Sequence, residues 1–280
     1  MSSTRTQQGA SHANGLRPQQ HAQAVLEQLR AIQKSIDELK SSIISSTTAK
    51  AVTLGAAIAT PAGGAGHASS ASSSSSSTFL SPLMSRYDLG AEAERRGYRT
   101  GVELGVQTGA FAEYALRTWP SCTTYYLVDI WKTQENYVDG ANVPQERQEQ
   151  NLADAKRRMQ PYASKAVFIR NFTSAAAPLI PDPVDFVYVD ARHDYCGVME
   201  DLRLYWPKVR SGGMMAGHDF IDAAEMSKIN DKEHWEVCQD GTKHPGAVRG
   251  AVVEFFQQLG LAVHVTYRDG PWNSWIVIKP

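Results

Sequence analysis

The sequence predicts an α/β domain with a doubly wound, mostly parallel sheet of seven strands and a C-terminal antiparallel hairpin. Short apolar stretches alternate regularly with helical patterns between residues 100 and 259. A glycine-containing turn, Glu103 to Gly109, joins the first apolar stretch to the first helical pattern. The last two apolar stretches, 262–267 and 274–278, are joined by a turn too short for a parallel crossover, so they must pair antiparallel.

The elements follow one another in a simple order. A first helix at 84–96 ends at Arg96-Gly97, because glycine stops helices. Strands are then predicted where the chain is rich in β-branched and aromatic residues, and helices where apolar residues recur every three or four positions. The strands are 100–104, 124–130, 166–170, 184–190, 214–218, 262–267 and 274–278, and the further helices are 110–118, 145–159, 175–179, 196–206 and 247–259.

The N-terminal part has a different composition. Residues 1–20 are polar and predict a disordered leader, whereas residues 21–45 carry a heptad spacing of apolar residues that predicts an amphipathic helix. That helix would either join copies of the chain through residues 22–43 or lie on the main domain. Residues 46–81 are rich in Ser, Ala and Gly and predict a flexible linker, so the folded domain is expected at residues 82–280.

Charge and cysteine content narrow the classes of function. With 28 basic and 29 acidic side chains the formal net charge is −1, which lacks the basic excess of a nucleic-acid-binding protein. The three cysteines are sparse and form no Cys-x-x-Cys, so we expect a reducing, cytoplasmic location without structural zinc. Organelle import stays open, because the leader is poor in acids. No apolar run is long enough to predict a membrane span.

The turn after the first strand predicts a nucleoside site. Gly105 and Gly109 allow a sharp bend and a close approach of backbone to ligand, while free N–H groups at the helix start favour an electron-rich partner. Asp129 ends the next strand, where an acid typically binds ribose hydroxyls. The alternative is an ordinary α/β turn with a glycine cap.

Residues from about Leu83 to Pro280 resemble the class I S-adenosylmethionine-dependent methyltransferases. The resemblance lies in the segments Glu103 to Gly109, Asp185 to Asp190 and Ser211 to Asp219, together with Asp129. Within that class it resembles a branch whose fourth strand ends Asp-x-x-His-x-Tyr and which includes metal-dependent sugar O-methyltransferases. Gln107 departs from the family, because many methyltransferases have a third glycine there.

The resemblance implies a set of contacts to S-adenosyl-L-methionine. Glu103 would orient its ammonium group, and Gly105 and Gly109 would face its methionine part. Asp129 would bind the ribose, with Ile130 and Thr173 beside the adenine. Ile130 also fits a plain core position, and Thr173 a helix cap.

Two acids at neighbouring strand ends predict a metal site. Asp190 and Asp219 follow the fourth and fifth strands, whose carboxyl ends meet at one edge of the sheet. Two such carboxylates repel unless a cation or a proton separates them, and their oxygens suit Mg²⁺ or Mn²⁺. His218 is a candidate third ligand. Alternatively, His218 and Asp219 cap the following turn, and Asp190 contacts only the cofactor.

His193 completes the predicted chemistry. It lies in the loop after Asp190, where a neutral imidazole, or Asp190 itself, would take a proton from an acceptor hydroxyl. Insertions at 131–144 and 220–246 would form the pocket for a small-molecule acceptor. The expected activity is methyl transfer to a hydroxyl; a nicotinamide-dependent oxidoreductase and a non-catalytic oligomeric scaffold are the alternatives.

Overall fold

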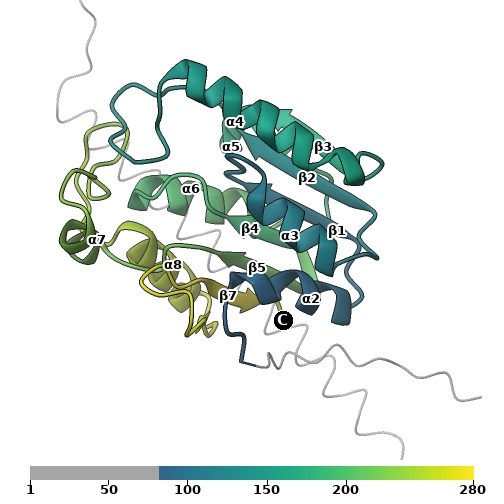
Figure 1. The fold of residues 1–280 in the computed structure, drawn as a ribbon. Helices are drawn as coiled ribbons and strands as arrows, with labels where there is room; N and C mark the ends of the chain where they lie inside the picture. Colours follow the sequence, from purple (N-terminus) through teal and green to yellow (C-terminus); the bar gives the residue numbers. More distant parts are fainter. Residues whose placement is uncertain (1–81) are drawn as a thin grey trace, which may run out of the picture. The chain divides into compact units, whose positions relative to one another are not determined.

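A seven-stranded sheet runs through residues 82–280, the part of the chain that the computed structural model describes (Figure 1). Its strand order is β3-β2-β1-β4-β5-β7-β6, so the order of winding reverses between β1 and β4. The pairs among β1 to β5 are parallel, whereas β7 runs antiparallel to both β5 and β6. The strands are β1 (Thr100–Leu104), β2 (Thr124–Asp129), β3 (Ala166–Arg170), β4 (Val184–Val189), β5 (Val209–Gly217), β6 (His264–Val265) and β7 (Trp275–Ile278). The predicted doubly wound sheet with its C-terminal antiparallel strands is confirmed.

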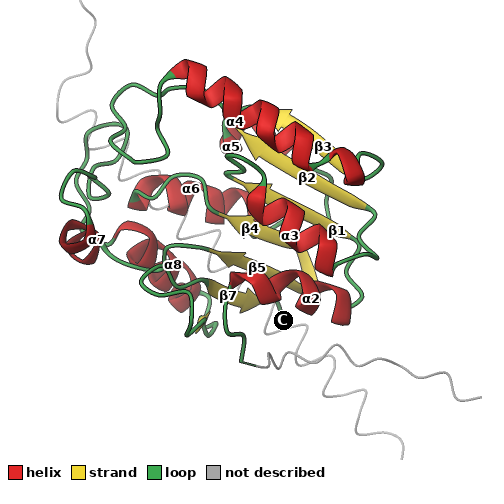
Figure 2. Cartoon of the chain, in the orientation of Figure 1, coloured by secondary structure: helices red, strands yellow, loops and turns green. Residues whose placement is uncertain are grey.

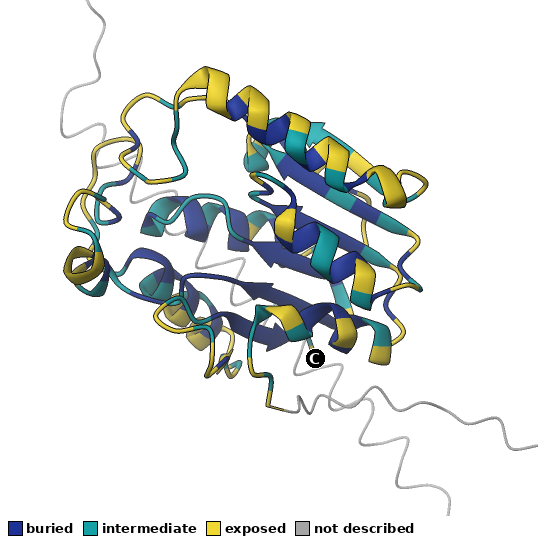
Figure 3. Ribbon diagram, in the orientation of Figure 1, coloured by how far each residue is buried: buried dark blue, intermediate teal, exposed yellow. Residues whose placement is uncertain are grey.

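Helices cover both faces of this sheet (Figure 2). One core cluster joins the first face of the sheet to α2, α3 and α4, and a second joins the opposite face to α5, α6 and α8. In Figure 3 the strands β1, β4, β5 and β7 are buried along most of their length, and the helices carry exposed residues on their outer sides. The helices are α2 (Leu89–Arg95), α3 (Ala110–Thr118), α4 (Gln145–Arg158), α5 (Thr173–Ala176), α6 (Tyr195–Tyr205), α7 (Ala223–Ile229) and α8 (Ala247–Gln258), with 3₁₀ turns η1 (Arg86–Asp88), η2 (Gln160–Tyr162) and η3 (Ala177–Leu179).

Successive side chains of a strand point to opposite faces of the sheet, so apolar strands make both faces of the sheet apolar. Val102 and Leu104 of β1 belong to one cluster, while Leu127 of β2 and Tyr188 of β4 belong to the other. A strand buried on both faces needs apolar residues at nearly every position, which is how these segments read. Glu103 breaks the rule, because it is a carboxylic acid that is only 1% exposed.

Several predicted boundaries differ from the structure. The first helix begins as the 3₁₀ turn η1 rather than at Met84, and β5 begins at Val209, five residues before its predicted start. The two C-terminal strands are shorter than predicted, and α7 was not predicted. The predicted leader, heptad helix and linker lie outside the described residues. No helix within residues 82–280 has the length and apolar character needed to cross a membrane.

Two of the cysteines are joined. Cys196 at the start of α6 and Cys238 in the insertion after β5 form a disulfide, with their Cα atoms 5.6 Å apart and a sequence separation of 42. Cys122 is a buried free thiol. The sequence analysis did not predict this pairing, and the predicted reducing, cytoplasmic location stays a prediction. The two residues meet only through the folded insertion, which a spacing rule cannot anticipate.

Candidate active site

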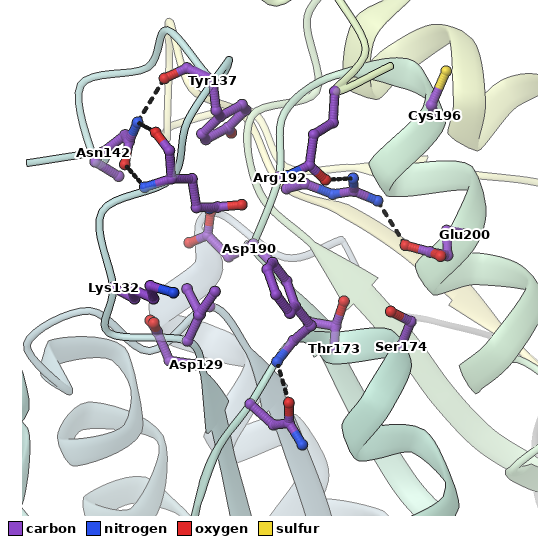
Figure 4. Close-up of a pocket in the computed structure, with 18 of the residues that line it drawn as sticks. Asp129, Lys132, Tyr137, Asn142, Thr173, Ser174, Asp190, Arg192, Cys196 and Glu200 are labelled. Atoms are coloured by element: carbon purple, nitrogen blue, oxygen red, sulfur yellow. Dashed lines mark hydrogen bonds and ion pairs between the residues drawn. The ribbon is translucent and has the colours of Figure 1, made fainter. Parts of the chain in front are cut away.

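Two adjoining cavities lie at the carboxyl ends of the parallel strands, where the strand order reverses between β1 and β4. Open α/β sheets bind ligands at this place. The larger cavity has a volume of about 630 Å³ and the smaller about 350 Å³. Gly105, Gln107, Ala141 and Asp190 line both of them. Figure 4 shows Asp129 at the end of β2, Thr173 at the start of α5 and Asp190 just after β4, all lining the larger cavity.

The turn after β1 explains the need for glycine at one position. Gly105 has φ +84°, and a Cβ there would lie 1.9 Å from the carbonyl oxygen of Asp190. Gln107 also has a positive φ, of 49°, so this residue adopts the conformation that a glycine usually supplies. Gly109 lines neither cavity, and its Cβ would meet the backbone of Ala155 at 3.1 Å. Gly109 therefore serves the packing of α3 on α4.

Asp129 is fixed rigidly beside this turn. Its Oδ2 accepts hydrogen bonds from the N–H groups of Val106 and Gln107 at 2.9 and 2.8 Å, and its Oδ1 accepts one from Trp131 N at 2.7 Å. Burial raises the pKa of Asp129, although these three bonds oppose the shift. A carboxylate offers about four acceptor positions, so this side chain keeps capacity for a ligand hydroxyl. It lines the larger cavity together with Ile130.

Thr173 is the first residue of α5 and also lines the larger cavity. Its carbonyl oxygen accepts a 2.6 Å hydrogen bond from Tyr205 of α6, which fixes the start of α5. Five of the six predicted cofactor residues therefore line the cavities, and Gly109 is the exception.

Glu103 places a buried acid on the smaller cavity. Its Oε2 accepts a 2.9 Å hydrogen bond from the hydroxyl of Tyr125. Burial raises the pKa of Glu103 well above its usual range, and the charges of Asp190 and Asp129 add to the shift. A cation beside this carboxyl would offset the cost of ionising it. The position therefore fits the ammonium group of an amino acid, as the resemblance implies.

Asp139 contacts His193 on the Nδ1 side of its ring. Asp139 Oδ2 lies 2.6 Å from His193 Nδ1, and the Asp139 side chain is only 2% exposed. The indole of Trp235 covers the imidazole, with ring centroids 4.4 Å apart. The hydroxyl of Tyr137 donates to Asp139 Oδ2 at 3.3 Å and accepts from His193 N at 3.1 Å. Asp139 was not among the predicted site residues, although it lies in the insertion at 131–144 that was predicted to form the acceptor pocket.

The other nitrogen of His193 faces the two predicted metal ligands. Nε2 lies 3.1 Å from Asp219 Oδ2 and 3.6 Å from Asp190 Oδ1. This atom is buried and has no hydrogen-bond partner of acceptable geometry among the described residues. Ligand atoms of all three residues lie within 4.8 Å of one another. Adjacent ligands of an octahedral ion, each at about 2.1 Å, stand about 3 Å apart, so the cluster fits a small divalent cation.

The backbone and charges around this cluster are unusual. Asp219 has φ +55°, a left-handed conformation that is uncommon for a non-glycine residue. Burial alone would raise the pKa of Asp219, but its contacts with His193 and His218 hold it well below the usual range. Burial alone would lower the pKa of His193, but the charge of Asp139 raises it well above the usual range. The cluster thus combines several charges in a largely buried space.

His218 has a different environment from the one predicted for a third ligand. Its Nδ1 lies 2.8 Å from Asp219 Oδ1 and 3.3 Å from a guanidinium nitrogen of Arg86. It lines the smaller cavity but is not one of the three residues whose ligand atoms converge. Arg86, which the sequence analysis also missed, brings a positive charge into the same cavity.

Comparison with known proteins gives one family match. Residues 102–220 match a family model described as "Methyltransferase domain". No curated protein sequence matches the chain.

Solved structures with a similar fold include an O-methyltransferase family protein from Burkholderia thailandensis, at 16% identity and a TM-score of 0.48, covering 69% of this chain and 55% of that one. Another is the O-methyltransferase TomG from Streptomyces achromogenes, in complex with SAM, at 14% identity and a TM-score of 0.47, covering 70% and 79%. A third is a putative caffeoyl-CoA O-methyltransferase from Staphylococcus aureus, at 13% identity and a TM-score of 0.48. The match covers 69% of this chain and 82% of that one. This chain thus spans about half the length of the Burkholderia protein.

Proposed function

We infer that this chain, whose residues 102–220 match a methyltransferase-domain family model, transfers a methyl group from S-adenosyl-L-methionine to a hydroxyl group of a small molecule with the help of a divalent cation. The observation that carries the proposal is the convergence of Asp190, His193 and Asp219 at the edge of the smaller cavity. Asp190 also lines the larger cavity, so this cluster lies where a nucleoside and an acceptor would meet.

The cofactor would extend across both cavities. Asp129 would bind the ribose hydroxyls and Ile130 and Thr173 would lie beside the adenine in the larger cavity, while Glu103 would bind the ammonium group in the smaller one. Gly105 borders both cavities, and the absence of a side chain there lets the ligand pass close to the backbone. When bound, the cofactor supplies an electrophilic methyl group on a sulfonium.

The cation would be held by Asp190, Asp219 and His193. This set exchanges the His218 of the sequence prediction for His193, because His193 Nε2 is the nitrogen that faces both carboxylates. A ligating histidine usually donates its second N–H to a carboxylate, and Asp139 at His193 Nδ1 is such a partner. When bound, the cation supplies a Lewis acid that lowers the pKa of an acceptor hydroxyl.

The protein's own groups position the acceptor and receive its proton. His193 cannot act as the base, because Nε2 would be a ligand and Nδ1 carries its proton toward Asp139. Asp190 would bind the cation through one carboxylate oxygen and accept the proton of the hydroxyl on the other. Its side chain is 22% exposed and reaches both cavities. Trp235 is only 4% exposed and lines the smaller cavity, where it excludes water from one side of the cluster. Alignment of acceptor and methyl group would supply much of the acceleration.

The test uses labelled cofactor, fractionated cell extract and a chelator. Chelation should abolish labelled product and added Mg²⁺ or Mn²⁺ should restore it, whereas cofactor affinity, measured by calorimetry, should change little. Asp219→Asn should weaken Mn²⁺ binding at least tenfold and abolish transfer, because it removes a charged ligand. Asp231→Asn is the matched control, since Asp231 is an exposed acid of the same insertion.

Two results would refute parts of this proposal. Full transfer in excess chelator would remove the cation and leave Asp190 and Asp219 as cofactor-binding or capping residues. A methyl group found on nitrogen or carbon of the product would refute the assignment to oxygen while leaving the methyltransferase fold intact.

A further inference from the structure

Arg86 is the positive charge in the smaller cavity that the proposed reaction does not use. It belongs to η1, the 3₁₀ turn that precedes α2, and lines the cavity together with Glu103, Thr108 and Phe111. Its side chain is 28% exposed. A guanidinium is always charged and carries five N–H donors, so its position in a confined space calls for acceptors.

The protein provides few good acceptors for this guanidinium. It hydrogen-bonds His218 Nδ1 at 3.3 Å and the hydroxyl of Tyr87 at 3.4 Å, and it also interacts with the buried hydroxyl of Tyr188. The only carboxylate oxygen of residues 82–280 within 4 Å is Asp190 Oδ2, at 3.9 Å, which is too long for a hydrogen bond. His218 Nδ1 is also 2.8 Å from Asp219 Oδ1. This nitrogen cannot both donate a proton to Asp219 and accept one from Arg86, so only one of the two hydrogen bonds can form. Donor capacity therefore remains on the side that faces the cavity.

The backbone of Arg86 is anchored firmly. Arg86 N donates a 2.6 Å hydrogen bond to Asp269 Oδ2, and Asp269 is itself held by the hydroxyls of Thr266 and Ser274 at 3.0 Å each. Thr266 is 2% exposed and Ser274 is fully buried. Met84 O also accepts hydrogen bonds from the chain just before Asp269. An anchored backbone restricts the positions open to the guanidinium, which reduces the conformational entropy that is lost when a ligand binds.

Opposite charges thus line one small cavity. Glu103 offers a carboxyl and Arg86 a guanidinium, and both border the space beside Gly105. A ligand with an ammonium and a carboxylate on the same carbon would satisfy both groups, whereas a ligand with one charge would leave the other unpaired. Guanidinium and carboxylate also match geometrically, since two parallel N–H···O bonds can form. The α-amino acid end of S-adenosylmethionine has this pattern.

We propose that Arg86 binds the α-carboxylate of the methionine end of the cofactor. The inference rests on the proposed function, because it assumes that this cofactor occupies the cavities. A carboxylate of the acceptor has the same chemistry, and it is the alternative source that the experiment must separate.

The experiment compares two ligands on the full chain by calorimetry: S-adenosylmethionine and its decarboxylated form, which keeps the amine. Arg86→Ala should weaken S-adenosylmethionine binding about 10- to 100-fold, the range of hydrogen bonds to a charged group. It should change the affinity for the decarboxylated form less than about threefold. Arg86→Lys should give an intermediate loss, because it keeps the charge without the paired donors.

Controls separate binding from folding. Melting temperatures of the variants should stay near that of the parent, and Arg86→Lys carries the test if Arg86→Ala does not fold. Lys132→Gln is the matched control, since Lys132 is an exposed cation that lines the larger cavity. It should affect both ligands equally.

Three results have different meanings. Equal weakening of both ligands by Arg86→Ala would overturn the inference, because the loss would not depend on the carboxylate. Unchanged S-adenosylmethionine affinity would also overturn it, and a raised KM for a carboxylate-bearing acceptor would then identify the other source. A parent protein that binds neither ligand would instead refute the proposed function.

Discussion

Asp139→Asn tests how the cation site is organised. The substitution keeps the size of the side chain but removes the charge that faces His193 Nδ1 at 2.6 Å. An asparagine amide can also turn its NH₂ toward Nδ1, which would remove the preference for Nδ1–H and a free Nε2. The imidazole of His193 should then be less well oriented and bind the cation more weakly.

The magnitude follows from burial. The Asp139 side chain is 2% exposed, so solvent does not screen its contact with His193. Hydrogen bonds to charged groups contribute about 1.5–3 kcal/mol, which corresponds to roughly 10- to 150-fold in an equilibrium constant. Loss of an outer carboxylate partner of a ligating histidine typically costs about 10–100-fold in metal affinity. We therefore expect Mn²⁺ binding to weaken about 10- to 100-fold.

The assay is a calorimetric titration of Mn²⁺ into parent and variant at a pH near 7.5. S-adenosylmethionine affinity should be unchanged, because Asp139 lies outside the predicted cofactor contacts, and Asp231→Asn should match the parent in both titrations. Unaltered Mn²⁺ affinity in a folded Asp139→Asn protein would refute the role of His193 as a ligand. The same loss in both titrations would indicate general damage to the smaller cavity.

Two further predictions concern stability. Burial raises the pKa of Asp201 from 3.8 to about 7, so the unfolded chain ionises first and stability should fall as pH rises between these values. Asp201→Asn should flatten that fall in urea unfolding curves, and an equal slope in both proteins would contradict the shift. The Cys196–Cys238 disulfide closes a loop over a sequence separation of 42, for which loop entropy gives a stabilisation of about 4 kcal/mol. A reductant should therefore lower the urea midpoint of the parent but not that of the double serine variant, and a reductant without effect on the parent would contradict the bridge.

The sequence predicted those parts of the site that follow from strand ends. Asp190 and Asp219 could be placed together because residues that follow adjacent parallel strands share one edge of the sheet, and β4 pairs Val189 with Gly217. Asp129 was placed on the cavities by the same reasoning, whereas the place of Glu103 was implied by the resemblance to methyltransferases. A residue at the carboxyl end of a parallel strand lies at the ligand-binding edge of the sheet, so its place follows from the position of the strand.

The parts that could not be predicted depend on loops. Asp139 reaches His193 across 54 positions, and Arg86 reaches His218 across 132, so no local pattern marks either contact. The helix α7 did leave a local signal, since Asp222 and Glu225 form a capping box at its start. That signal was missed inside a segment read only as an insertion.

A calorimetric titration of S-adenosylmethionine into the full chain tests the central point most directly. The account predicts binding at one site per chain, and it predicts that Asp129→Ala weakens this binding at least tenfold, because a ribose loses its charged partner. The variant's melting temperature must show that it is folded, since Asp129 also accepts three backbone hydrogen bonds. No binding of S-adenosylmethionine together with tight binding of NADH would contradict the account.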